Sequence, residues 1–166
     1  MASITLKGQE IHTSGNLPKI GSLAPGFTLT KQNLTNASLS DFKGKKIVLN
    51  IFPSLDTGTC AASVRAFNKV ATDLDNTVVL CISKDLPFAH KRFCEVEGIK
   101  NVITLSDFKN NNFSDAYQNI IVDGPMTGLL SRTIVIINES GNVTYTEQVP
   151  EIGQEPDYDA TLASLE

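Results

Sequence analysis

The chain has 166 residues and a formal net charge of −4, and hydrophobic residues make up 41% of it. This length and balance predict one globular domain, residues 1–166, with a full hydrophobic core. An acidic chain without a long basic run is not expected to bind nucleic acid. No apolar run approaches the roughly 20 residues of a membrane helix, and the first residues lack the apolar core of a signal peptide. We therefore expect a cytoplasmic protein that does not contact a membrane.

The chain contains three cysteines, Cys60, Cys81 and Cys94. An odd number without close pairing does not predict a disulfide scaffold, so any disulfide is expected to be transient. The two histidines, His12 and His90, share no metal-ligand spacing with a pair of cysteines. We therefore expect no metal and no cofactor.

The N-terminal region is expected to be mainly β-strand and loop. Residues 1–13 alternate apolar and polar side chains around Lys7-Gly8, which predicts a β-hairpin. The glycines and prolines of residues 14–26 predict a loop, and residues 27–30 a short strand. A polar stretch then follows, with a turn-like element at residues 39–42.

A strand, a loop and a helix are predicted next, and they are central to the function. The apolar run at residues 47–52 predicts a buried strand, which Pro53 ends because proline cannot donate to a sheet. A polar loop spans residues 54–59, and a helix is expected to begin at Cys60. Apolar residues recur at helical spacing and form one stripe of this helix, which comprises Cys60, Val64, Phe67, Ala71 and Leu74.

The position of Cys60 has two interpretations. The first turn of a helix carries unsatisfied N–H groups and a partial positive charge, so it stabilises a nucleophilic thiolate. A cysteine on an apolar stripe can equally be an inert, buried side chain. Thr57 and Pro53 lie three and seven residues upstream, and a hydroxyl and a proline there could bind and shield a thiolate.

The segment that follows predicts a second strand and a second helix. Residues 77–82 form a continuous apolar run, typical of a parallel strand buried on both faces. Cys81 lies inside this run and is expected to be structural, because a thiol in apolar surroundings stays protonated. The next helix is expected to begin with Asp85 as its N-cap and Pro87 in its first turn. Cys94 then falls at the edge of the apolar face, where a neutral boundary role is the alternative to a chemical one.

The C-terminal half is less regular. Strands are predicted at residues 102–105 and 131–137, the latter joined by a turn at 139–142 to a partner strand at 143–148. Asparagines around residues 110–114 indicate a loop, and residues 156–165 a final helix. Arg132, at the mouth of a strand, either forms a weak surface ion pair or stabilises an anion. Arg65, on the Cys60 helix, could assist or face solvent.

The segment Pro53-Ser54-Leu55-Asp56-Thr57-Gly58-Thr59-Cys60 resembles the active-site motif of the peroxiredoxins, and the longer string NIFPSLDTGTCAASVRAFN is similar to their bacterial thiol peroxidase subfamily. The similarity extends to ITLKGQEIHTSG, SKDLPFAHKRFC, SRTIVIINESGNVTY and EPDYDATLASL, and so to nearly the whole chain. It implies an α/β, thioredoxin-like fold: a central mixed sheet flanked by helices, with the hairpin of residues 1–13 added.

The resemblance also implies the chemistry. Cys60 corresponds to the peroxidatic cysteine and Cys94 to the resolving cysteine, with which it would form an intramolecular disulfide. Pro53, Thr57 and Arg132 correspond to the residues that bind the peroxide. The implied substrates are hydrogen peroxide and organic hydroperoxides, the implied reductant is thioredoxin, and the implied assembly is a homodimer.

Two other functions remain open from the residues alone. A general thiol–disulfide oxidoreductase would share the fold but normally uses a Cys-x-x-Cys motif, which this chain lacks. A binding module without catalysis would use all three cysteines for packing. The combination of Pro53, Thr57, Cys60 and Arg132 favours the peroxidase.

Overall fold

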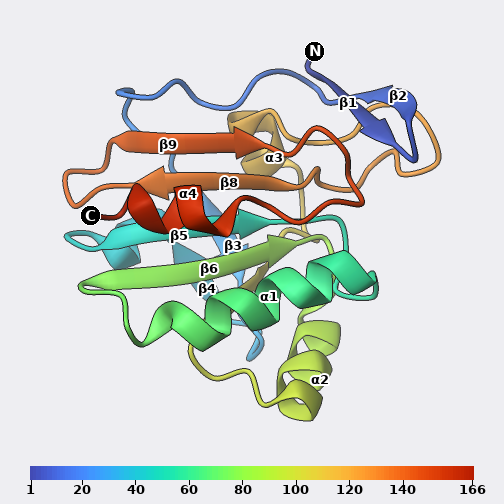
Figure 1. Cartoon of the computed structure of the whole chain (residues 1–166). Coiled ribbons are helices and arrows are strands. Elements are labelled where there is room, and N and C mark those ends of the chain that lie inside the picture. Colours follow the sequence, from blue (N-terminus) through green and yellow to red (C-terminus); the bar gives the residue numbers. More distant parts are fainter.

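The computed structural model describes all 166 residues as a seven-stranded sheet with helices on both faces and a separate two-stranded hairpin (Figure 1). Along the chain the elements are β1 (Ser3–Leu6), β2 (Gln9–His12), β3 (Thr28–Thr30), β4 (Asn36–Ser38), the 3₁₀ helix η1 (Leu39–Phe42), β5 (Lys46–Ile51), α1 (Gly58–Ala71), β6 (Thr77–Ser83), α2 (Pro87–Glu97), β7 (Ile103–Ser106), α3 (Asn112–Tyr117), β8 (Thr133–Ile137), β9 (Val143–Gln148) and α4 (Tyr158–Ala163).

The large sheet is mixed, in the order β4-β3-β7-β6-β5-β8-β9. Strands β5, β6 and β7 are parallel, whereas β8 and β9 on one side and β3 and β4 on the other are antiparallel. The continuous apolar runs of β5 and β6 occupy the centre because both faces of a central parallel strand are covered. This arrangement confirms the predicted mixed α/β sheet, and it directs the carboxyl ends of β5 and β6 to one edge.

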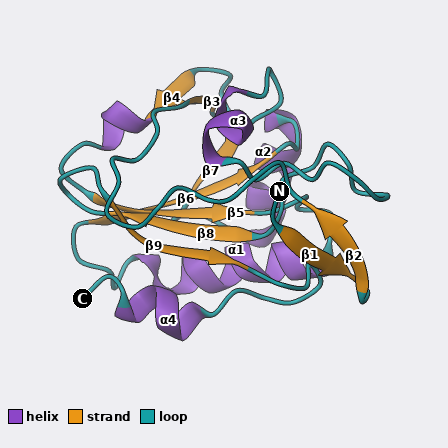
Figure 2. Ribbon diagram, turned by 90° about the horizontal axis from the view of Figure 1, so that it is seen from above, coloured by secondary structure: helices purple, strands orange, loops and turns teal.

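Alternate residues of the central strands pack into two apolar clusters, one on each face. Val48 and Val79 belong to the cluster under α1 and α4, while Leu49 and Leu80 belong to the opposite cluster. Figure 2 shows α1 and α4 together on one side of the sheet and α3 on the other. All three cysteines lie in the α1 and α4 cluster. No helix is long and apolar enough to span a bilayer.

The N-terminal hairpin is present where the sequence predicts it. Lys7 and Gly8 form its turn with φ angles of 51° and 79°, the left-handed conformation that favours glycine. The hairpin docks on the segment that follows β9, since Gly8 N–H and the Thr5 hydroxyl both donate to the Glu151 carboxylate. Hydrogen bonds from the Gly153 N–H, the Gly8 N–H and the Thr5 hydroxyl stabilise the Glu151 carboxylate and lower its pKa to about 2.

Two sequence predictions about helices are wrong. Helix α2 begins at Pro87 with Leu86 as its N-cap, so Asp85 does not cap it. The Asp85 carboxylate instead accepts hydrogen bonds from residues outside the helix, described below. The predicted loop at residues 110–114 contains the start of α3, because Phe113 and Tyr117 lie one turn apart and their rings stack at 4.7 Å in the core.

Strand β4 (Asn36–Ser38) was not predicted, because its polar sequence lacks the apolar alternation of a strand. It forms by pairing with β3 at the edge of the sheet. The remaining predicted elements are confirmed with ends displaced by a few residues, including the turn at 39–42, which is a 3₁₀ helix, and the final helix, which is shortened to Tyr158–Ala163.

Candidate active site

Cys60 lies in the first turn of α1, at the edge of the sheet where β5 ends. Thr57 is the N-cap of α1, and its hydroxyl oxygen accepts the Cys60 N–H at 3.3 Å. The Thr57 hydroxyl in turn donates to the Ser54 carbonyl at 3.2 Å, which folds the loop into the helix start. The Cys60 side chain is fully buried, as expected from the apolar stripe, and Pro53, seven residues upstream, is also buried.

Arg132 is the charged residue that donates a hydrogen bond to the Cys60 sulfur. It lies immediately before β8, and its side chain is almost fully buried. One terminal nitrogen, Nη2, lies 3.4 Å from Cys60 Sγ, and Nε donates to the Ile152 carbonyl at 2.9 Å. The other terminal nitrogen, Nη1, is buried without a protein partner. The surface ion pair considered from sequence is therefore wrong.

This arrangement leaves a buried cation without a carboxylate partner. Arg132 takes part in none of the ion pairs of the structure. Burying an unpaired guanidinium is unfavourable unless an anion is nearby, and the only group at hydrogen-bonding distance that can become one is the Cys60 thiol. The site thus places a buried cation without a carboxylate partner, and a free N–H donor, beside the Cys60 sulfur.

Cys94 lies on α2 and is 8% exposed, whereas Cys60 and Cys81 are fully buried. This agrees with its predicted place at the edge of the apolar face. Burial raises the pKa of the Cys94 thiol, and hydrogen bonds with Gln32 and Thr104 oppose that rise. All three cysteines are free thiols in the structure.

Cys81 is fully buried in β6 and contacts no charged group. The Asn50 side-chain amide donates to its sulfur, with a nitrogen–sulfur distance of 3.7 Å. Burial raises the pKa of the Cys81 thiol to about 12. This agrees with the structural role expected from the sequence.

The other titratable candidates lie away from Cys60. Arg65 is half-exposed and forms a two-bond ion pair with Glu97, at 2.7 and 3.0 Å, so of the two sequence alternatives it takes the solvent-facing one. His12 contacts Asp123 and Glu10 on the hairpin, and His90 is buried on α2. No group of three or more His, Cys, Asp or Glu side chains is arranged to hold a metal ion.

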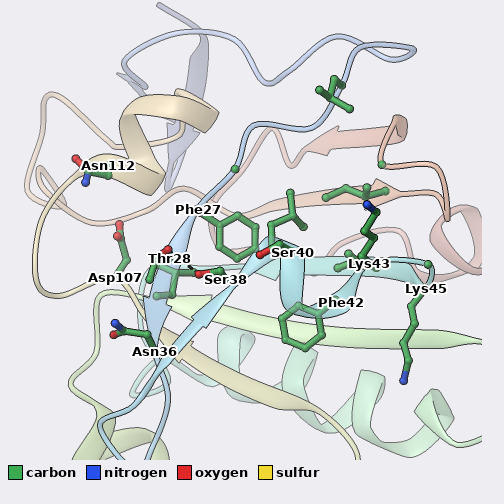
Figure 3. Close-up of a pocket in the computed structure, with 18 of the residues that line it drawn as sticks. Phe27, Thr28, Asn36, Ser38, Ser40, Phe42, Lys43, Lys45, Asp107 and Asn112 are labelled. Carbon is green, nitrogen blue, oxygen red and sulfur yellow. Dashed lines mark hydrogen bonds between the residues drawn. The ribbon is translucent and has the colours of Figure 1, made fainter.

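A cavity of about 940 Å³ lies on the opposite face of the sheet from Cys60. Figure 3 shows Phe27 and Phe42 inside it, with Asp107 and Asn112 at one end and Lys43 at the other. None of the cysteines and no residue of the Arg132 site lines it. This cavity is therefore separate from the contact between Cys60 and Arg132.

Two contributions to the site were not predicted from sequence. The Ile152 carbonyl fixes the Arg132 guanidinium, and Gly153 accepts a hydrogen bond from the Thr59 hydroxyl at 3.0 Å, next to Cys60. Both are backbone groups of a loop about 90 residues away from Cys60 in the chain. A backbone carbonyl has no sequence signature, so no pattern could have identified them.

The fold and the site together define a thioredoxin-like protein with a buried, arginine-paired thiol at a helix N-terminus. The profile of the Redoxin family matches residues 19–162. Thiol peroxidases of Mycobacterium tuberculosis and Mycobacterium bovis are 55% identical over 165 residues, which covers 99% of both chains. Among solved structures, a peroxiredoxin-like protein from Aquifex aeolicus superposes with a TM-score of 0.93 at 34% identity, over 98% of this chain and 95% of that one. A thiol peroxidase from Chromobacterium violaceum, at 20% identity, shares the fold with a TM-score of 0.88, over 96% and 92% of the two chains.

The chain therefore belongs to the redoxin family and, within it, to the thiol peroxidases. This establishes it as an enzyme and excludes the binding module without catalysis. The thioredoxin-like fold with an N-terminal hairpin, implied by the resemblance, is confirmed.

Proposed function

We propose that this enzyme reduces hydrogen peroxide and organic hydroperoxides through Cys60, with Cys94 as the resolving cysteine. The observation that carries the proposal is the 3.4 Å contact between Arg132 Nη2 and Cys60 Sγ in a site without any carboxylate partner for the arginine. A peroxidatic thiol requires a cation beside its sulfur and a donor for the oxygens of the substrate, and a guanidinium can serve as both.

In the first step the Cys60 thiolate attacks one oxygen of the hydroperoxide. An S–O bond forms, the O–O bond breaks, and the leaving alkoxide or hydroxide takes up a proton as the alcohol or water. Cys60 becomes a sulfenic acid, the first product of thiol oxidation. Negative charge grows on the leaving oxygen, and Arg132 Nη1, which has no protein partner, is the available donor to it.

Thr57 and Pro53 complete the site in this proposal. Thr57 holds the first turn of α1 through the Cys60 N–H, and rotation of its hydroxyl away from the Ser54 carbonyl would present a second donor to the peroxide. Pro53 lacks an N–H and shields the thiolate from water. The predicted substrate contacts therefore remain Pro53, Thr57 and Arg132.

In the second step the Cys94 thiolate attacks the Cys60 sulfur. An S–S bond forms, and the hydroxide that leaves is protonated to water. A disulfide requires Cα atoms within roughly 7 Å, whereas Cys60 and Cys94 are buried on different helices. The raised pKa of Cys94 also keeps it protonated in the folded protein. On these grounds we propose that the two segments open locally before resolution.

The cycle closes when an external dithiol reduces the disulfide by thiol–disulfide exchange, and we propose thioredoxin as that reductant. We also propose a cytoplasmic homodimer. The reductant and the homodimer rest on the family resemblance alone.

The experiment that tests the function is the intact mass of the wild type and of Cys94→Ser after one equivalent of cumene hydroperoxide. The wild type should lose the mass of two hydrogens, and the variant should gain one oxygen that dimedone traps. Peptide mapping should identify Cys60–Cys94 as the bridge. An unchanged wild-type mass would contradict the proposal.

A further inference from the structure

Asp85 lies between the two segments that carry Cys60 and Cys94. It follows β6 and precedes α2, and its carboxylate reaches across to the loop that leads into α1. Oδ1 accepts the Ser54 hydroxyl at 2.8 Å, and Oδ2 accepts the Leu55 N–H at 2.8 Å. Oδ2 also accepts the Ser83 hydroxyl at 2.6 Å. One carboxylate thus takes three hydrogen bonds, two of them from the Cys60 loop.

The same network continues onto α2. Ser83 Oγ lies 2.9 Å from Nε2 of His90, which is fully buried one turn before Cys94. The single hydroxyl hydrogen of Ser83 goes to Asp85, so the His90 Nε2 must donate to Ser83. His90 is therefore the neutral Nε2–H tautomer, consistent with its Nδ1 having no partner.

The centre of this network is fixed by the sheet. The Ser106 hydroxyl at the end of β7 donates a short hydrogen bond to the Asp85 carbonyl, and Asp85 N–H lies 3.3 Å from Ser83 Oγ. The Asp85 side chain is only 11% exposed. A nearly buried carboxylate therefore joins the Cys60 loop on one side to the residues that lead into α2 on the other.

We propose that Asp85 is a positioning residue that keeps the Cys60 loop closed against the start of α2 and thereby sets how often the sulfenic acid is over-oxidised before Cys94 can resolve it. This inference rests on the proposed function, in which both segments must open for the disulfide to form.

Two reactions compete for the Cys60 sulfenic acid. In the open state the Cys94 thiolate displaces hydroxide, and the disulfide and water result. In the closed state Arg132 remains beside Cys60, and a second hydroperoxide transfers one oxygen to the sulfur: its O–O bond breaks, an alcohol leaves, and a sulfinic acid results. The hydrogen bonds of Asp85 exist only in the closed state, so they favour the second reaction over the first.

A second contact between the loop and α2 provides a matched control. Asp56 and Arg92 approach to 3.4 Å, but their side chains are 74% and 64% exposed. An exposed pair at this distance contributes little. Asp56→Asn therefore removes one negative charge from the contact between the Cys60 loop and α2, without removing the three hydrogen bonds of Asp85.

The first arm of the experiment measures over-oxidation. Wild type, Asp85→Asn, Ser54→Ala and Asp56→Asn are treated with a tenfold excess of cumene hydroperoxide, and disulfide and sulfinic acid are quantified by mass spectrometry. An asparagine offers one acceptor oxygen where the carboxylate takes three donors, so Asp85→Asn should lower the ratio of sulfinic acid to disulfide about tenfold, equivalent to about 1.4 kcal/mol. Ser54→Ala should have a smaller effect in the same direction, and Asp56→Asn should match the wild type.

The second arm uses no peroxide and measures amide hydrogen exchange of the reduced proteins. In Asp85→Asn the amides of residues 54–60 and 86–94 should exchange about tenfold faster, while those of β5 and β6 should not change. Equal exchange and equal product ratios in Asp85→Asn and Asp56→Asn would overturn the inference. A wild type that forms no disulfide would instead contradict the proposed function, and the exchange arm would still decide whether Asp85 holds the loop.

Discussion

Cys60 and Cys81 are both fully buried in the same apolar cluster, yet their sulfur atoms face different groups. Cys81 faces the neutral amide of Asn50, and burial raises its pKa to about 12. Cys60 faces the Arg132 guanidinium, which lacks any other anion to pair with. Burial alone makes a thiol inert, and burial beside an unpaired cation makes it a candidate nucleophile.

The difference originates in the elements that carry the two residues. Cys81 lies inside a central strand, where main-chain groups are paired with β5 and β7 and only side chains can approach the sulfur. Cys60 lies at the end of a strand and the start of a helix, where unpaired N–H groups and a loop from a distant part of the chain come together. The edge of the sheet formed by the carboxyl ends of parallel strands is where such groups converge.

The strongest test of this contrast replaces each thiol in turn. Cys60→Ser should abolish measurable consumption of hydroperoxide with dithiothreitol as reductant, because a serine hydroxyl cannot be oxidised in this way. Cys81→Ala should keep the rate within about twofold while lowering stability by about 1 kcal/mol through the small cavity it leaves. Peroxide consumption is followed by a ferrous–xylenol orange assay and stability by urea unfolding. Full activity of Cys60→Ser would show that the two thiols were assigned the wrong roles.

The second test removes the cation and leaves the thiol in place. Arg132→Met has a similar length but no charge and no donor, and it should slow oxidation of Cys60 by about 10²- to 10³-fold, the range typical of losing one oxyanion donor. Arg65→Met, a half-exposed arginine on the Cys60 helix, is the matched control and should remain within about twofold of the wild type. The measurement is the second-order rate constant from stopped-flow mixing with hydroperoxide. A loss of less than tenfold in Arg132→Met would mean that Arg132 is not the activating cation.

His90 extends the comparison from thiols to a base. Burial without a charged partner should favour the neutral form of a histidine, as it does for the Cys81 thiol. Burial lowers the pKa of His90 from its ordinary 6.5 to about 4, and Asp85, at 4.0 Å, opposes this only partly. Between pH 6.5 and 4 the unfolded chain binds a proton that the folded protein excludes. Stability should therefore fall as pH drops through this window, by about 3 kcal/mol at pH 4.

A single pH titration of the wild type would not isolate this contribution, since Asp107 acts in the opposite direction. Burial raises the Asp107 pKa from 3.8 to about 6, so its proton stabilises the folded state as pH falls through that range. The informative quantity is the difference in unfolding free energy between the wild type and His90→Gln, whose amide keeps a donor toward Ser83 without titrating. A difference that does not vary between pH 7 and 4 would contradict a neutral His90.

The sequence predicts those parts of the site that are formed by residues close together in the chain. The apolar run at residues 47–52, the proline after it and the stripe headed by Cys60 predict the strand, the loop and the buried helix face, and all three are present. The contacts that give Cys60 its chemistry join residues far apart in the chain, such as the 72-residue separation between Cys60 and Arg132. These contacts could not be derived from the residues alone: Arg132 was a candidate from its residue type, but only the family resemblance implied its role beside Cys60.

The errors have the same origin. Asp85 is a residue type favoured at N-caps, but its carboxylate accepts hydrogen bonds from three donors in β6 and the Cys60 loop. Helix α2 therefore has Leu86 as its N-cap, without a side-chain hydrogen bond. Helix α3 forms in an asparagine-rich stretch because Phe113 and Tyr117 pack on Phe27. In both cases tertiary contacts override a local preference.

Thr57 gives the smallest of the expected effects and separates the local part of the site from the long-range part. Its hydroxyl caps α1 through the Cys60 N–H, so Thr57→Val should lower stability by about 1 kcal/mol, the usual value of an N-cap. Thr57→Ser keeps the hydroxyl and should restore stability. If Thr57 also binds the peroxide, Thr57→Val should slow Cys60 oxidation about tenfold at a temperature where it is fully folded, and Thr57→Ser should restore the rate. An unchanged oxidation rate in a destabilised Thr57→Val would limit Thr57 to holding the helix, and would leave Arg132 as the donor on which the reactivity of Cys60 depends.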